Sequence, residues 1–126
     1  MRRILIVEDN EMNRDMLGRR LQRRGFDVLY ASDVDTAVTV TQRERPRLIL
    51  MDIGLGTESG LDATRQIRGR ESGCRVPIIA LTAHAMMSDR EKCLAAGCDD
   101  FETKPVDFGR LVKKIERYLE TEKATE

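Results

Sequence analysis

The sequence predicts an α/β domain in which strands and helices alternate around a parallel sheet. Three short runs, residues 4–7, 48–51 and 76–81, are almost continuously apolar, as is typical of strands covered by helices on both faces. Segments with helical spacing of apolar residues lie between these runs, so a strand–helix unit repeats five times along the chain. We therefore expect a doubly wound (βα)5 domain with right-handed crossovers.

The first half of the chain contains the first three strand–helix units. The strand at 4–7 is followed by a helix with apolar residues at helical spacing, and Gly25 is suited to the end of that helix. A weaker strand is expected at 26–31, and a second helix at 34–43. The third strand, at 48–51, is then followed by a helix over 60–70.

The second half contains the last two units. After the strand at 76–81, Ser88 and Glu91 form a possible capping box for a helix that ends at Gly97. A weaker strand is expected at 99–102. The last helix has the clearest pattern, with Asp107 as its expected N-cap. Its apolar residues are Phe108, Leu111, Val112, Ile115, Tyr118 and Leu119.

Composition narrows the possible functions. The 126 residues are enough for one domain, and the 22 basic and 22 acidic residues balance, which argues against direct nucleic-acid binding. The apolar run near the N-terminus is too short for a signal peptide or a membrane helix, so we expect a cytoplasmic protein without membrane insertion. Cys74, Cys93 and Cys98 are expected to be free thiols. The first methionine and the polar end favour a whole protein.

Functional groups follow four of the predicted strands. Glu8 and Asp9 come after the first strand, Asp52 after the third, Thr82 after the fourth and Lys104 after the fifth. Ligands of open α/β sheets bind at this edge. Three carboxylates brought together there repel one another unless a hard cation such as Mg²⁺ joins them. With a hydroxyl and an ammonium group beside them, they are suited to phosphoryl transfer onto a carboxylate. Taken singly, an acid after a strand is more often a helix cap or a solvated loop residue, Lys104 would usually be a surface lysine, and Thr82 a turn residue.

These residues and their surroundings resemble the receiver domain of bacterial two-component response regulators over essentially the whole chain. The similar stretches are "ILIVEDN", "LILMDI", "PIIALTA" and "DDFETKP". "EDNEMN" and "TAHAM" are most similar to receivers of hybrid kinases and to their stand-alone relatives, the single-domain regulators of chemotaxis and cell division. The resemblance implies a flavodoxin-like sheet with strand order 2-1-3-4-5. It also implies a receiver domain over residues 1–121, a frayed tail at 122–126 and no output domain.

The resemblance implies a role for each site residue. Asp52 would accept a phosphoryl group from a histidine kinase or a histidine phosphotransfer protein, and the product would switch binding to a downstream protein effector. Mg²⁺, or Mn²⁺, would be held by Asp9, Asp52 and the carbonyl of Gly54, with Glu8 acting through water. Thr82 and Lys104 would contact the phosphoryl group.

Other residues would serve the switch and the partners. Phe101 would be the switch aromatic that moves with Thr82. Met12, Asn13 and Met16 would contact the phosphodonor, although methionines at helical spacing are more often core residues.

The chain also departs from the family pattern. Gly56 replaces the usual proline, and we expect a looser loop there. Glu102 replaces an aliphatic residue, which indicates an exposed edge strand. The lone His84 is expected to shape access to the phosphoryl group or a partner surface. The bond between Lys104 and Pro105 resembles the cis peptide of the family.

Two other functional classes are alternatives to a signalling module. A phosphatase with an aspartyl nucleophile would need a second acid two residues later, where this chain has Gly54, and a cap domain. A flavodoxin-like FMN carrier would need an anion-accepting loop after the first strand, where this chain has Glu8, Asp9 and Glu11. Both alternatives are therefore ranked below a signalling module.

Overall fold

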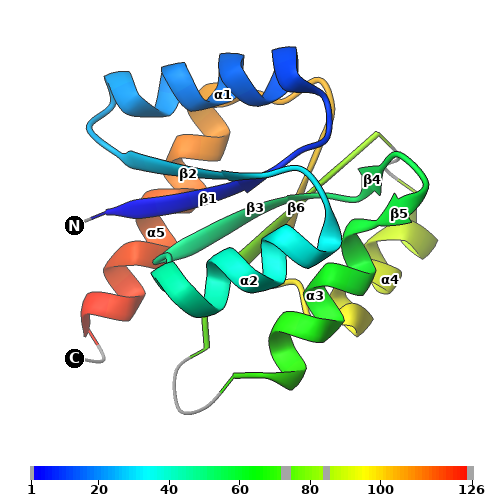
Figure 1. Ribbon diagram of the computed structural model, residues 1–126. Helices are drawn as coiled ribbons and strands as arrows, with labels where there is room; N and C mark the ends of the chain where they lie inside the picture. Colours follow the sequence, from blue (N-terminus) through cyan, green and yellow to red (C-terminus); the bar gives the residue numbers. More distant parts are fainter. Residues whose placement is uncertain (1, 72–74, 84–85, 125–126) are drawn as a thin grey trace.

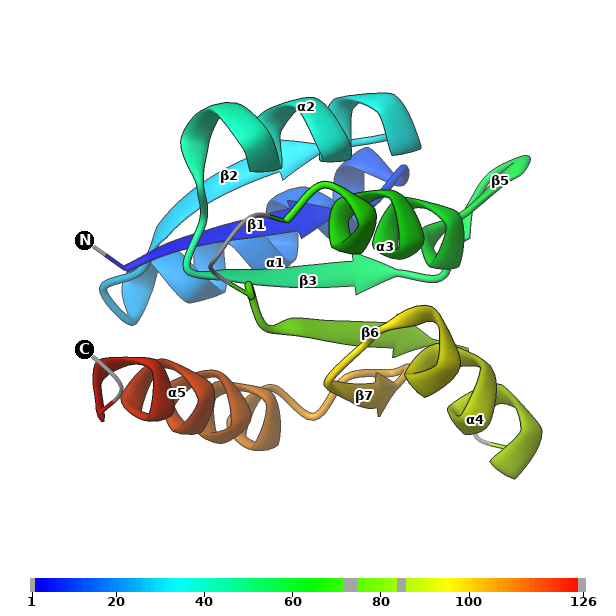
Figure 2. The same ribbon diagram turned by 90° about the horizontal axis from the view of Figure 1, so that it is seen from below.

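The computed structural model describes residues 2–71, 75–83 and 86–124 and contains one five-stranded parallel sheet. Its strands are β1 (Arg3–Val7), β2 (Asp27–Ala31), β3 (Leu48–Asp52), β6 (Ile78–Thr82) and β7 (Asp100–Thr103). They lie in the order β2-β1-β3-β6-β7, of which Figure 1 shows the strands from β2 to β6 and Figure 2 shows all five. This is the 2-1-3-4-5 order implied by the resemblance, so the fold class is confirmed.

Five helices cover the sheet. They are α1 (Glu11–Arg23), α2 (Val34–Glu44), α3 (Gly60–Gly69), α4 (Met87–Ala96) and α5 (Phe108–Ala124). Alternate residues of each strand point to opposite faces, and this separates two hydrophobic cores. Leu5 belongs to the core cluster that includes residues of α2, α3 and α4, whereas its neighbour Ile6 belongs to the cluster that includes residues of α1 and α5. The central strands are buried on both faces, which explains their continuous apolar runs.

The predicted helix ends at Asp107 and Gly97 are confirmed, and Asn10 caps a further helix. Asn10 accepts from the amide of Asn13 at the start of α1, and Asp107 accepts from the amide of Arg110 at the start of α5. Gly97 ends α4 in the left-handed conformation, with φ of 113°. The Ser88 capping box was wrong, because the N-cap of α4 is two residues earlier and has no side-chain cap.

Glu102 contradicts another expectation. β7 is an edge strand of the sheet, but the Glu102 side chain faces α5 and the residue is only 3% exposed. Its carboxylate accepts two hydrogen bonds from Nε of Arg110, at 2.7 and 3.2 Å, and lies 3.5 Å from Nζ of Lys114. Burial is tolerated because two cations on α5 compensate the charge.

The segment after β3 also differs from the prediction. β4 (Gly54–Leu55) and β5 (Glu58–Ser59) pair in an antiparallel hairpin with Gly56 and Thr57 as its two-residue turn. Gly56 has φ of 66°, which is the conformation that glycine supplies at the first central position of such turns. The expected loose loop is therefore a paired turn.

The carboxyl ends of the parallel strands share one edge of the molecule, and the hairpin lies at the same edge (Figure 2). β1 begins and α5 ends at the opposite edge. Among the described residues, no helix has the length and apolar character needed to cross a membrane.

Candidate functional site

The predicted groups at the strand ends are brought together. Asp52 is the last residue of β3 and Thr82 the last of β6, and the two are 4% and 5% exposed. Glu8 follows β1 and is 5% exposed, while Asp9 beside it is open to solvent. Lys104 follows β7, and its backbone amide donates to the carbonyl of Thr82 at 2.7 Å. Four strand ends thus contribute to one site.

Hydrogen bonds fix the carboxylate of Asp52 in place. Its Oδ2 accepts from Nζ of Lys104 at 2.7 Å, and its Oδ1 accepts from the amide of Gly54 at 3.0 Å. The same ammonium group donates to Oε2 of Glu8 at 3.4 Å, and the other oxygen of Glu8 accepts from the amide of Asn10 at 3.1 Å. Lys104 therefore bridges two buried acids.

The electrostatics follow from this crowding. Burial, together with hydrogen bonding to Asp52 and its charge, raises the pKa of Glu8 to about 7. Burial alone would lower the pKa of Lys104. Hydrogen bonds and charge attraction from Asp52 and Glu8 outweigh that effect, so the pKa is raised above its usual value. The three acids of the site thus outnumber the ammonium group that binds two of them.

A hard divalent cation would compensate the excess of negative charge among these acids. Oxygen atoms of Glu8, Asp9 and Asp52 all lie within 4.8 Å of one another. Two ligands of one Mg²⁺ ion, each about 2.1 Å from it, are at most about 4.2 Å apart. The three acids are thus close enough to share one Mg²⁺ ion, which usually takes one or two carboxylates directly and keeps several waters. An all-oxygen donor set is also what Mg²⁺ and Mn²⁺ prefer.

The predicted switch and partner residues lie outside this acidic centre. Phe101 is half-buried, with the guanidinium of Arg90 from α4 4.8 Å from its ring centroid. Met12 and Met16 are 72% and 57% exposed on α1, so they are not core residues. They line a surface hollow together with Asn10, Glu11, Asp15 and Arg19.

Some predictions concern residues elsewhere. Cys93 and Cys98 are buried free thiols, as predicted, and the peptide bond between Lys104 and Pro105 is cis. Cys74 and His84 lie outside the described residues.

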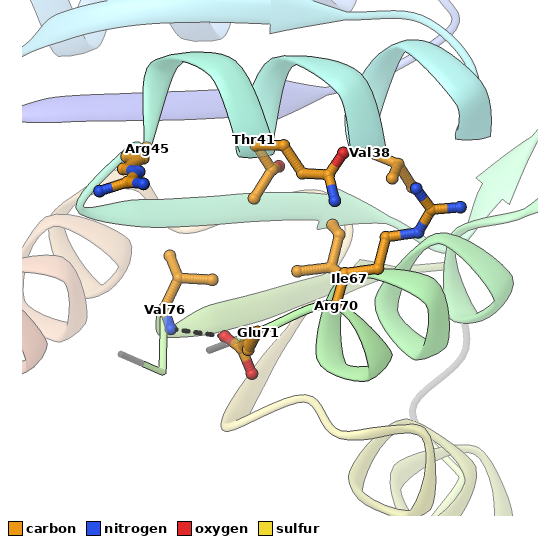
Figure 3. A pocket seen from close by; sticks show the side chains of 8 residues that line it. Val38, Thr41, Arg45, Ile67, Arg70, Glu71 and Val76 are labelled. Atoms are coloured by element: carbon orange, nitrogen blue, oxygen red, sulfur yellow. Dashed lines mark hydrogen bonds between the residues drawn. The ribbon is translucent and has the colours of Figure 1, made fainter. Parts of the chain in front are cut away.

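A second hollow, of about 340 Å³, lies between α2 and α3 toward the opposite edge of the sheet (Figure 3). Val38 and Ile67 are among its apolar residues, and Arg45 and Arg70 lie on its rim. Glu71, which also lines it, accepts a hydrogen bond from the amide of Val76 at 2.8 Å. None of the predicted site residues lines this hollow, so it is unrelated to the acidic centre.

The sequence reasoning missed two features near the site. The β4–β5 hairpin had only a weak signal, the glycine that begins its two-residue turn, because Gly54, Glu58 and Ser59 are not typical strand residues. The position of Arg90 over Phe101 had none, since it depends on how α4 packs against β7.

Comparison with known proteins agrees with the geometry. The model of the family described as "Response regulator receiver domain" matches residues 4–116. The chain is 34% identical over 116 residues to the polar-differentiation response regulator DivK of Brucella anthropi, covering 92% of this chain and 94% of that protein. It is 38% identical to hybrid signal transduction histidine kinase I of Dictyostelium discoideum, over 98% of this chain but only 8% of the kinase.

A solved structure is similar throughout. The receiver domain of sensor histidine kinase PA1611 from Pseudomonas aeruginosa, crystallised with a magnesium ion coordinated in its active-site cleft, has a TM-score of 0.85 and 42% identity. The match covers 94% of this chain and 97% of that one. Sequence, fold and the clustered acids thus lead to the same assignment: the chain belongs to the response regulator receiver domain family of two-component signalling.

Proposed function

We propose that Asp52 is the phosphoacceptor of this receiver. The observation that supports this most directly is the position of its carboxylate. It is held at the end of β3, 2.7 Å from the ammonium group of Lys104 and in reach of two further acids. A nucleophile fixed in this way needs little reorganisation before it attacks phosphorus.

The metal is Mg²⁺, with Mn²⁺ as a substitute. Asp9, Asp52 and the backbone carbonyl of Gly54 would hold it, and Glu8 would act through water. When bound, the ion neutralises charge on the phosphoryl oxygens.

Phosphoryl transfer to Asp52 regenerates the free histidine of the donor. An oxygen of Asp52 forms a bond to phosphorus while the bond between phosphorus and the donor's imidazole nitrogen breaks, and the nitrogen keeps the electron pair. Lys104 donates to one phosphoryl oxygen and the hydroxyl of Thr82 to another. Attack by water on the same phosphorus later releases inorganic phosphate and restores the carboxylate. The chain thus assists its own phosphorylation by the donor and its own dephosphorylation by water.

The exposed residues of α1 indicate where a phosphodonor protein binds. A histidine kinase or a histidine phosphotransfer protein approaches through α1, where Met12 and Met16 are exposed beside Asn13. Phosphorylation adds nearly two negative charges. Thr82 and Phe101 transmit that change to a downstream protein effector. The setting is the cytoplasm, and neither nucleic acid nor a membrane is a direct partner.

One experiment tests the chemistry. The protein is incubated with Mg²⁺ and acetyl phosphate, and its intact mass is measured. We expect one phosphoryl adduct that is stable in acid and lost in base. It should disappear in Asp52→Asn and persist in Asp62→Asn, which changes an exposed acid on α3. An adduct that survives in Asp52→Asn, or no adduct in the presence of Mg²⁺, would refute the proposal.

A further inference from the structure

The β4–β5 hairpin contacts the acidic centre directly. The amide of Gly54 donates to Oδ1 of Asp52 at 3.0 Å. Gly56, in the turn, lies so close to Asp9 that a Cβ atom added to it would be 3.4 Å from Oδ2. The hairpin therefore borders two of the three acids, and its position affects where their oxygens can meet a cation.

The hairpin is too small to hold this position alone. Its ladder has only two residue pairs, Gly54 with Ser59 and Leu55 with Glu58. A short two-stranded ribbon is at best marginally stable without further packing. Leu55 supplies part of that packing, because it is buried in the same core cluster as Val34 at the start of α2.

Glu58 supplies a second attachment. Its Oε1 accepts a hydrogen bond from the backbone amide of Val34 at 3.1 Å. That amide is the first of α2, and the cap residue Asp33 accepts from a different one, that of Thr36. Val34 would otherwise have no partner within the helix, and the positive end of the helix dipole favours a carboxylate there. The Glu58 side chain thus links the hairpin to α2, across a separation of 24 residues.

We propose that Glu58 is a positioning residue for the metal site, which fastens the β4–β5 hairpin to the N-terminus of α2 and thereby keeps Gly54 and Asp9 in place for Mg²⁺. This inference rests on the proposed function. Glu58 itself is exposed and is not one of the acids grouped at the centre, so it acts through the hairpin. Residues that orient metal ligands from outside typically change metal affinity about 10- to 100-fold when they are replaced.

Charge and reach can be separated by two substitutions. Glu58→Asp keeps the negative charge but shortens the side chain, so the link to Val34 is lost. Glu58→Gln removes the charge but keeps a carbonyl oxygen at the same reach. If Glu58 fastens the hairpin, Glu58→Asp is the more harmful change. If it only adds negative charge near the cation, Glu58→Gln is the more harmful one. Asp35→Asn, an exposed acid in the first turn of α2, is the matched control.

The test measures the Mg²⁺ dissociation constant by calorimetry, and the phosphoryl half-life after treatment with acetyl phosphate. Urea unfolding of the metal-free variants checks that they remain folded. We expect Glu58→Asp to weaken Mg²⁺ binding by about tenfold. Glu58→Gln should weaken it much less, and Asp35→Asn should bind as the wild-type protein does. The amide resonances of Gly54 and Gly56 should shift in Glu58→Asp.

The outcomes separate this inference from the function on which it rests. A wild-type protein that takes neither Mg²⁺ nor the phosphoryl group would overturn both. A wild-type protein that takes both, with unchanged binding and half-life in Glu58→Asp, would overturn the role of Glu58 alone. Stronger weakening in Glu58→Gln than in Glu58→Asp would also overturn it, because charge would then be the cause.

Discussion

Replacing Glu8 by glutamine should change how the stability of the metal-free protein depends on pH. The ordinary pKa of this carboxyl is 4.5, and in the folded protein it is raised to about 7. A raised pKa in an acid means that the folded state binds the proton more tightly than the unfolded state. The wild-type protein should therefore lose stability as the pH rises between these two values. Glu8→Gln carries no titrating group at this position and should not show this loss.

The size of the effect follows from the two pKa values. Below pH 4.5 the carboxyl is protonated in both states and carries no penalty, and above pH 7 the penalty is complete. Integrating the linkage between pH 5 and pH 8 gives about 2 to 3 kcal/mol. The attraction of Lys104 is already included in the raised value. Constant effects of the substitution cancel when the two proteins are compared at both pH values.

The assay is urea unfolding, followed by circular dichroism, at several pH values from 5 to 8 in the presence of EDTA. We expect the two curves of unfolding free energy against pH to diverge, with Glu8→Gln relatively more stable at pH 8. Mg²⁺ should restore the unfolding free energy of the wild-type protein at pH 8. At pH 7 its binding should release protons, which calorimetry in two buffers would detect. Parallel pH curves for the two proteins would refute the reasoning.

The remaining predictions concern stability and use the same unfolding measurement. Gly60→Ala should cost about 1 to 3 kcal/mol, because the new Cβ would overlap the backbone carbonyl of Asp52. Gly69→Ala, at the end of the same helix with nothing within 4 Å, is its control and should be neutral or stabilising; equal losses would contradict this reading. Asp107→Ala should cost about 1 kcal/mol by removing the cap of α5, and an unchanged midpoint would count against that cap. Met86→Asp should add a cap that α4 lacks and raise the midpoint, whereas a lower one would show that no cap forms.

The arrangement of the strands could be predicted because burial on both faces leaves a strong pattern. Central strands such as Leu48–Asp52 have apolar side chains in both cores, and few other elements have such short continuous runs. The meeting of Asp52, Thr82 and Lys104 followed from topology alone, since parallel strands end at a common edge. Strand ends therefore identified the acidic site before any distance was known.

Other features depend on partners that a single stretch of sequence does not reveal. Glu102 is buried because Arg110 and Lys114 reach it from α5, whereas a lone glutamate in an edge strand is usually exposed. The start of α4 was misplaced because Ser88 and Glu91 match a capping box without forming one. The absence of the family's proline at Gly56 predicts a looser loop. The two-residue turn that Gly56 makes with Thr57 explains the glycine instead.

The position of the first strand and the last helix has a practical consequence for reporter fusions. β1 begins and α5 ends at the edge away from the acidic centre. A fluorescent protein or an affinity tag joined before β1 or after α5 would start its linker on the far side from Asp52. Such fusions should leave the approach of a phosphodonor to α1 open. The pull-downs and imaging experiments needed to find the partners can therefore attach the reporter before β1 or after α5.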